Sequence, residues 1–243
     1  VGGGIMGGGI GQALLQHGYA VTVRDVEEDV LETTRERIVS GNFGLERAVE
    51  WSRRLGRPLV ILEALRIGYR WASDRLHRFA LDGMSENRER LRDSRITHLA
   101  YVEREEGEGR GLLEALAGRS AVVVTDDFPS FFLPRMVRAA GEALDVRLEV
   151  VDSNGLLPMA AADRMYKAAY HFRRFLQKEL PRHLEAFPAE HPLMGAPLPT
   201  FPETGARPPA EDGRVQDRWP LADEGLLQRG DGLVALDIDH DVT

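Results

Sequence analysis

The residues whose types and spacing most clearly suggest a chemical role lie at the start of the sequence. Gly2, Gly4 and Gly7 fit the spacing Gly-x-Gly-x-x-Gly. In a strand–turn–helix unit, the first glycine makes the tight turn, the second lets the backbone approach a pyrophosphate, and the third packs helix against strand. Asp25 follows Gly7 by 18 residues, at the end of the next expected strand, where a carboxylate accepts the ribose hydroxyls of NAD. The sequence therefore predicts a dinucleotide site at Gly2, Gly4, Gly7 and Asp25.

The same glycines also suit a turn that binds no ligand. Only Val1 stands where the strand before the glycine turn is expected, and a first residue other than Met suggests a fragment. The fingerprint also supplies only the adenosine half of a dinucleotide site. Both interpretations stay open here, and any NAD affinity is expected to be weak.

Two further clusters have residue types that bind ligands. Asp126 and Asp127 follow an expected strand, where α/β proteins form their sites; they suit a metal or polar ligand, although a solvated helix cap is the favoured interpretation. Basic residues around a later helix suit phosphate, although a solvated face or a docking face is favoured: Arg164, Lys167, Arg173, Arg174, Lys178 and Arg182. No metal site is predicted, because the chain has no cysteine and His171 has no second histidine at ligand spacing.

Short apolar segments alternate with helix-length segments along most of the chain. Runs of Val, Ile and Leu predict strands at 21–25, 59–64, 96–102, 121–125 and 147–152. Apolar spacing near 3.6 predicts helices at 44–55, 73–91, 132–144 and 168–180. In the second of these helices the expected inner face is Leu76, Phe79, Ala80, Gly83 and Met84. The alternation predicts an α/β fold: a doubly wound, mostly parallel, Rossmann-like sheet with helices on both faces.

The composition changes near residue 187, and seven prolines lie between residues 188 and 209 with little apolar periodicity. Such a segment is typical of an extended, Pro-rich connector. We therefore expect a dinucleotide-binding-like start at 1–40, an α/β domain at 41–186 and a connector at 187–243. Limited proteolysis would then cut first beyond residue 187.

The bulk properties narrow the function classes. The net charge of −8 disfavours binding to nucleic acid through the overall field, although a local basic face remains open. The sequence shows neither a long apolar span nor a signal peptide. Together with the absence of cysteine, this leads us to expect a cytoplasmic location.

Residues 1–38, beginning VGGGIMGGGIGQALLQHGYAVTVRD, resemble the opening of 3-hydroxyacyl-CoA dehydrogenases. The resemblance implies that Gly2, Gly4 and Gly7 line the pyrophosphate of NAD and that Asp25 meets the adenosine ribose. The catalytic His–Glu pair of that family lies much later and has no match here. Residues 41–50 suit either this family or the one that the following residues resemble. We therefore expect the boundary between the two resemblances to lie there.

Residues 51–243 resemble the N-terminal α/β domain of DNA photolyases, nearest the class II branch. The stretches that carry the resemblance are RRLGRPLVILEALR (53–66), WASDRLHRFALDGM (71–84), GLLEALAGRSAVVVTDDFPSFFLPRM (111–136) and VVDSNGLLPMAAADRMYKAAYHFRRFL (150–176). The segments RWP (218–220) and ALDIDHDV (235–242) resemble the family's connector.

This second resemblance implies light-driven repair of cyclobutane pyrimidine dimers by reduced FAD. In the family, FAD and damaged DNA bind a C-terminal helical domain that has no match here, so no catalytic residue is assigned and the chain alone is expected to be inactive. The α/β domain carries an antenna chromophore in some members and docks onto the helical FAD domain. The chain alone is thus expected to bind DNA weakly or not at all.

Three functions are compatible with these patterns. The longer resemblance favours a photolyase-like N-terminal part. The glycine fingerprint supports an NAD-binding, dehydrogenase-like oxidoreductase fragment as the alternative. A non-catalytic module that binds a nucleotide or a chromophore is the third.

Overall fold

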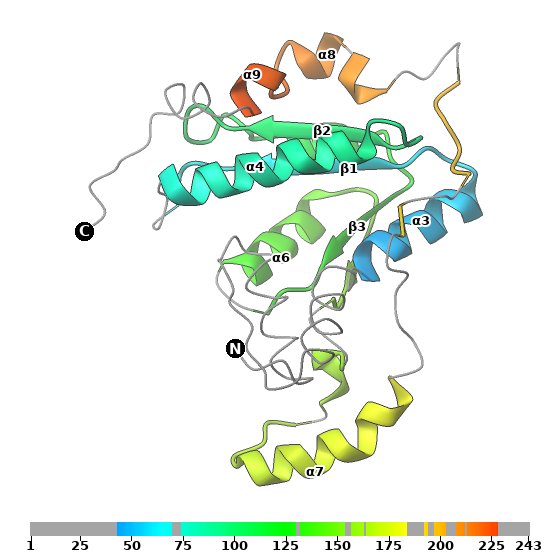
Figure 1. Ribbon diagram of the computed structural model, residues 1–243, viewed down its shortest axis with the longest axis vertical. Helices are drawn as coiled ribbons and strands as arrows, with labels where there is room; N and C mark the ends of the chain where they lie inside the picture. The colour runs from blue at the N-terminus through cyan, green and yellow to red at the C-terminus, as the bar shows by residue number, and fades with distance from the viewer. Residues whose placement is uncertain are drawn as a thin grey trace, which may run out of the picture. The chain divides into compact units, whose positions relative to one another are not determined.

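The computed structural model describes residues 43–69, 74–129, 132–153, 157–162, 164–183, 192–193, 197–202, 208–211 and 213–227 (Figure 1). The expected strand at 21–25 and the expected unit at 1–40 lie outside these residues. Chain contacts define two compact units. The first comprises Val1–Ala48, Val123–Ala143 and Leu148–Pro192, as far as these ranges are described. The second comprises Val49–Val122, Leu144–Arg147 and Leu193–Thr243, with the same restriction.

The second unit is built on a parallel pair of strands, β1 (Val60–Leu65) and β2 (Thr97–Val102). Their register runs from Val60 opposite Thr97 to Leu65 opposite Val102. The 18-residue helix α4 (Asp74–Leu91) lies between the two strands in sequence. Parallel neighbours need a crossover of this kind, because a tight hairpin can join only antiparallel strands. The near-continuous apolar runs of β1 and β2 suit a sheet that is covered on both faces.

One face of this pair packs against α4 and the short helix α9 (Glu224–Leu227). Side chains alternate along a strand, so Ala100 and Val102 of β2 point to the same face. They contact Leu81 and Met84 of α4. The same cluster includes residues of the C-terminal segment: Ala222, Leu226 and Leu227.

The opposite face packs against α5 (Leu112–Ala117) and α8 (Gly213–Gln216). Leu99 and Tyr101 alternate with the residues of the first face and are both buried. Their buried partners are Leu112, Leu116, Val215 and Trp219. The β1–β2 pair therefore has helices on both faces, as the sequence predicts for an α/β protein.

The segment after residue 187 differs from the expected extended connector. Within its described part it forms the helical turn η3 (Pro209–Glu211) and the helices α8 and α9. Trp219 and Leu227 are 5% and 2% exposed, respectively, and fill opposite faces of the β1–β2 pair. The prolines break long periodic patterns, so composition does not reveal these short buried elements. The division at 186/187 stays a prediction.

Arginines of α4 bind the main chain of this C-terminal segment. Arg78 donates through Nη2 to the carbonyl of Leu227 at 2.7 Å, and Arg88 donates through Nη2 to the carbonyl of Ala222 at 2.6 Å. The Ala222 N–H donates to the Ala100 carbonyl of β2 at 2.8 Å. Packing removes water from these backbone groups, and the bonds provide the hydrogen-bond partners that water would otherwise supply.

The first unit contains most of a second two-stranded sheet, in which β3 (Val122–Asp126) pairs with β4 (Arg147–Val151). Helix α6 (Leu133–Ala143) follows β3, and η1 (Met159–Ala161), α7 (Ala169–Glu179) and η2 (Leu180–Arg182) follow β4. The helix α3 (Phe43–Leu55) begins in the first unit and ends in the second. The Ser153 hydroxyl links this unit's elements, because it accepts from the Gly44 N–H and donates to Asp126.

The structure confirms an α/β fold with a parallel strand pair. The finer prediction, a doubly wound sheet, is not shown, since each sheet of the described residues has two strands. Among the helices that the structure describes, none combines the length and the apolar character needed to cross a membrane.

Candidate functional site

The four predicted nucleotide-binding residues, Gly2, Gly4, Gly7 and Asp25, all lie outside the described residues. Their site therefore stays a prediction. The described part contains two clusters of polar side chains that could do chemistry. One is a glycine-rich loop after β2, and the other is a histidine–carboxylate pair between β1 and β2.

The loop at residues 103–111 follows the carboxyl end of β2, where ligand sites form in α/β sheets. Its carboxylate Glu103 is 1% exposed. Glu103 Oε1 accepts from the N–H groups of Gly107 at 2.8 Å and Gly109 at 3.4 Å, and Oε2 accepts from the Ile67 N–H at 3.1 Å. A second carboxylate, Glu108, accepts from the N–H groups of Arg104 and Glu105.

Glycines let this loop pack closely against aromatic rings. A Cβ on Gly109 would lie 3.1 Å from Cε1 of Tyr101, and a Cβ on Gly111 would lie 3.3 Å from Cζ2 of Trp219. Gly107 and Gly111 also adopt a φ of 84°, which favours glycine. The glycines thus serve packing and turn formation.

The loop is a poor site for phosphate. Phosphate-binding loops offer free backbone N–H groups to an anion. Here four N–H groups of the loop, including those of Gly107 and Gly109, already donate to the carboxylates of Glu103 and Glu108. A phosphate would also meet the negative charge of those carboxylates. The diphosphate of FAD or NAD therefore does not fit this loop.

Tyr101 lies beside this loop and is 2% exposed. Burial, together with the nearby negative charges of Glu108 and Glu103, raises the pKa of Tyr101 to about 12. The phenol therefore stays protonated at neutral pH and cannot act as a base there. Its hydroxyl has no hydrogen-bond partner among the described residues.

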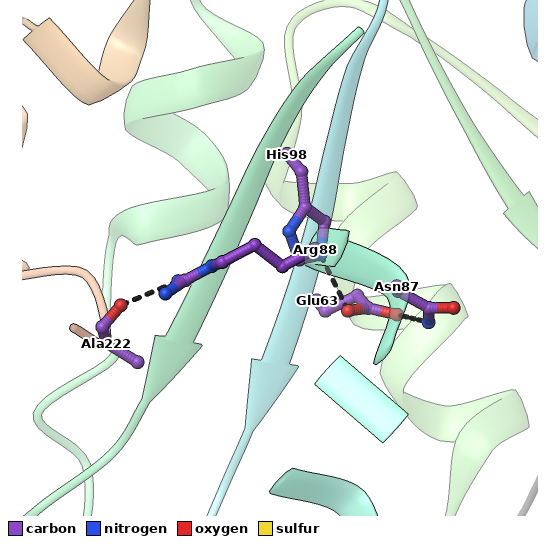
Figure 2. Close-up of polar contacts among 5 residues, drawn as sticks. All are labelled: Glu63, Asn87, Arg88, His98 and Ala222. Carbon is purple, nitrogen blue, oxygen red and sulfur yellow. Dashed lines mark hydrogen bonds and ion pairs between the residues drawn. The ribbon is translucent and has the colours of Figure 1, made fainter. Parts of the chain in front are cut away.

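The second cluster joins β1, β2 and α4 (Figure 2). Glu63 lies opposite Ala100, and His98 lies opposite Ile61, so Glu63 and His98 are diagonal neighbours on one face of the strand pair. His98 Nε2 lies 2.7 Å from Glu63 Oε2. Asn87 of α4 donates through Nδ2 to Glu63 Oε1 at 2.6 Å.

A histidine beside a carboxylate can transfer protons when a substrate reaches the ring. The His98 side chain is only 5% exposed, because α4 covers this face of the strands. The carboxylate of Glu63 accepts from both strand and helix, so the cluster ties α4 to the β1–β2 pair. Its geometry supports a structural role.

The described residues contain no group of three or more His, Asp or Glu side chains placed to hold a metal ion. The Asp126–Asp127 pair is thus not part of such a group within the described residues. Asp126 Oδ1 instead accepts from the Ser153 hydroxyl at 2.6 Å, and the Asp127 N–H donates to the Val151 carbonyl at 2.7 Å. Both aspartates thus contribute to the connection between β3 and β4.

The fold and these clusters define an α/β protein with a glycine-rich loop and a histidine–carboxylate pair on its parallel strand pair. Two comparisons with known proteins refine this class. The family model described as "3-hydroxyacyl-CoA dehydrogenase, NAD binding domain" matches residues 1–55. A curated deoxyribodipyrimidine photo-lyase of Methanothermobacter thermautotrophicus is 31% identical over 146 residues, which are 60% of this chain and 31% of the relative.

The chain thus spans about a third of the length of the curated relative that it matches. No solved structure matches the chain significantly. The two matches agree with the two resemblances in the sequence. The first match covers less than half of this chain, and the second covers less than a third of the relative, so neither match assigns the chain to a family.

Proposed function

We propose that this chain supplies the α/β part of a photolyase-like protein and does not carry out light-driven repair by itself. The observation that carries the proposal is the 31% identity over 146 residues to a deoxyribodipyrimidine photo-lyase. The α/β character of the described residues supports it, because the resemblance implies an α/β domain here. FAD and damaged DNA would bind a helical domain onto which this part docks.

The described residues support a non-catalytic role for this part. Within them, Gly107 and Gly109 of the loop at 103–111 donate their N–H groups to Glu103, and His98 of the Glu63–His98 pair has a side chain that is only 5% exposed. FAD does not fit the loop, so no step of repair is assigned to it. An antenna chromophore stays part of the proposal through the family resemblance alone.

The first prediction is that the purified chain leaves thymine dimers intact. A dimer-containing oligonucleotide would be illuminated with blue light in the presence of the chain and reduced FAD, and the lesion would be followed by chromatography. The reason is that the family resemblance assigns the flavin and the lesion to a helical domain, whereas this chain resembles the α/β part. The archaeal relative serves as the positive control, and turnover by the chain above the no-protein control would contradict the proposal.

A domain exchange tests the positive half of the proposal. The stretch of the archaeal relative that aligns with this chain would be replaced by the corresponding 146 residues of this chain. The exchanged protein is expected to bind FAD and to repair dimers within about tenfold of the relative. An unrelated α/β domain of similar length is the matched control. Equal repair by both exchanges would remove the specific support for the proposal.

A second candidate function, NAD binding, is favoured by the family-model match to residues 1–55. Gly2, Gly4 and Gly7 would line the pyrophosphate, and Asp25 would accept the ribose hydroxyls. The fingerprint supplies only the adenosine side of a dinucleotide site. Ordering a loop of small residues costs about 1–2 kcal/mol per residue, which offsets much of the roughly −8 kcal/mol of a micromolar complex.

We therefore expect NADH to bind more weakly than the micromolar range and dehydrogenase activity to be absent. The measurement is a titration of NADH fluorescence with the full chain and with Asp25→Ala, which removes the ribose acceptor. Asp93→Ala, on an exposed residue, is the matched control. Tight, saturable binding that Asp25→Ala abolishes would instead establish a working cofactor site and favour the dehydrogenase-like function.

A further inference from the structure

Positive charge is concentrated around the helix α7. Residues 164–183 hold six basic residues and one acidic residue, a net charge of +5 in a chain of net charge −8. The helix α7 forms the middle of this segment, and none of its residues is buried. A local positive field on an acidic chain attracts polyanions to that place.

The side chains of α7 separate into two faces. Residues three and four apart share one face of a helix. The exposed face of α7 is formed by the residues that we call the α7 patch: Tyr170, Arg173, Arg174, Gln177 and Lys178. The opposite face is half-buried and contains Phe172, Phe175 and Leu176.

The half-buried face supports the helix. The ring of Tyr166 packs against those of Phe172 and Phe175, with centroid distances of 5.5 Å and 5.1 Å, respectively. Phe172 and Phe175 stack on each other at 6.1 Å. These contacts occupy the aromatic rings of that face, so they leave the α7 patch as the side that meets solvent.

The positive charge of the α7 patch exceeds the acidic charge beside it. Glu179, the one acidic residue of the segment, lies 2.7 Å from Arg182 and 3.9 Å from Lys178. Arg174 lies over the Tyr170 ring, 6.0 Å from its centroid. Within the described part of the chain, no ion pair is recorded for Arg173.

An exposed aromatic ring stands in the middle of this charge. Tyr170 is 58% exposed, and its ring packs at 4.4 Å from that of His171. Its hydroxyl accepts from Arg174 Nη1 at 3.3 Å, which fixes the ring beside a cation. Cations that bind phosphates, together with an exposed ring on which a base stacks, are the elements of single-strand recognition.

We infer that the α7 patch is a docking surface for single-stranded nucleic acid. Arg173, Arg174 and Lys178 would contact successive phosphates, and Tyr170 would stack on an unpaired base. The exposed ring favours a single strand over a duplex, because the bases of a duplex are already stacked on one another. It also favours a single strand over an acidic protein, because binding an acidic protein requires cations but no exposed aromatic ring. This inference replaces the expectation from the family resemblance that the chain alone binds DNA weakly or not at all. It does not depend on the proposed function.

The test uses the full chain and a fluorescein-labelled 15-nucleotide oligothymidine, followed by fluorescence anisotropy. Saturable binding is expected at about 50 mM salt. Three phosphate contacts give a slope of about −2 in a plot of log K against log salt. Failure to bind under these conditions would overturn the inference.

Variants separate the contribution of the phosphate contacts from that of base stacking. Arg173→Gln combined with Lys178→Gln removes two phosphate contacts and is expected to reduce the salt slope by about 1.4 and to weaken binding at least tenfold at low salt. Tyr170→Leu is expected to weaken binding about tenfold without changing the slope, whereas Tyr170→Phe retains the ring and the affinity. The matched control is Arg90→Gln with Arg92→Gln, whose side chains are each 63% exposed on and beside α4.

Three outcomes would overturn the inference. The first is that the Arg90/Arg92 control loses as much affinity as the α7 patch variant, which would show that only net charge matters. The second is that Tyr170→Leu binds like the unaltered chain. The third is that duplex DNA, phosphatidylserine vesicles or polyglutamate bind as tightly as the oligothymidine. Circular dichroism of each variant confirms that α7 and the rest of the fold are retained.

Discussion

Replacing Glu103 with alanine is expected to lower the free energy of unfolding by about 3–5 kcal/mol, because it leaves three part-buried N–H groups without an acceptor. Three backbone N–H groups, those of Ile67, Gly107 and Gly109, donate to the Glu103 carboxylate. Each N–H group left unsatisfied costs about 1–3 kcal/mol when it stays buried. The loop would open to recover hydrogen bonds with water, and Tyr101 would lose the cover of Gly109.

Urea denaturation followed by circular dichroism measures this loss. Glu105→Ala is the matched control, since Glu105 is exposed and its side chain accepts no recorded bond from the loop; its free energy of unfolding is expected to change by less than about 0.5 kcal/mol. Glu103→Gln retains an acceptor oxygen and should be intermediate. If Glu103→Ala unfolds at the same urea concentration as the control, the carboxylate does not organise the loop.

The second large effect is expected for Trp219→Ala, at about 3–5 kcal/mol of the free energy of unfolding, because it leaves a cavity in a packed cluster. Trp219 is 5% exposed and packs with Leu99, Tyr101 and Leu112. Its ring also lies against Gly111, which has no side chain to fill the space left by the indole. Thermal or urea unfolding gives the size of the loss.

Two variants accompany Trp219→Ala. Trp219→Phe keeps most of the apolar volume and should lose much less stability. Arg218→Ala removes only the neighbouring cation, which lies 4.6 Å from the centroid of the indole, and should change stability by about 1 kcal/mol or less. A Trp219→Ala protein as stable as the original chain would show that the segment after residue 187 behaves as the connector expected from its composition.

The strands were predictable because their apolar runs are short and nearly uninterrupted. The predicted strand at 96–102 is observed as Thr97–Val102, and that at 59–64 as Val60–Leu65. The inner face of α4 was not predictable to the same degree. Phe79, expected inside, is 42% exposed, whereas His77 is fully buried with Leu81. A polar ring in the core interrupts the apolar period from which a helix face is inferred.

The role of Glu103 was also hidden in the sequence. It is one of four glutamates between residues 103 and 108, and composition cannot distinguish them. The usable signal is the strand period, since Leu99, Tyr101 and Glu103 are alternate residues and all three are buried. The site predicted at Gly2, Gly4, Gly7 and Asp25 stays a prediction, because these residues lie outside the described residues. A glycine spacing defines a turn but not the partner that the turn binds.

The burial of the C-terminal segment against both faces of the β1–β2 pair has a consequence for biosynthesis. Ala100 and Val102 leave the ribosome roughly 125 residues before Leu227, with which they share a core cluster. At about 5–20 residues per second, this delay lasts roughly 6–25 s. During that time the apolar faces of β1 and β2 lack part of their native cover. The nascent chain therefore presents a surface for chaperones until translation passes α9, and premature termination before that point would release a product prone to aggregation.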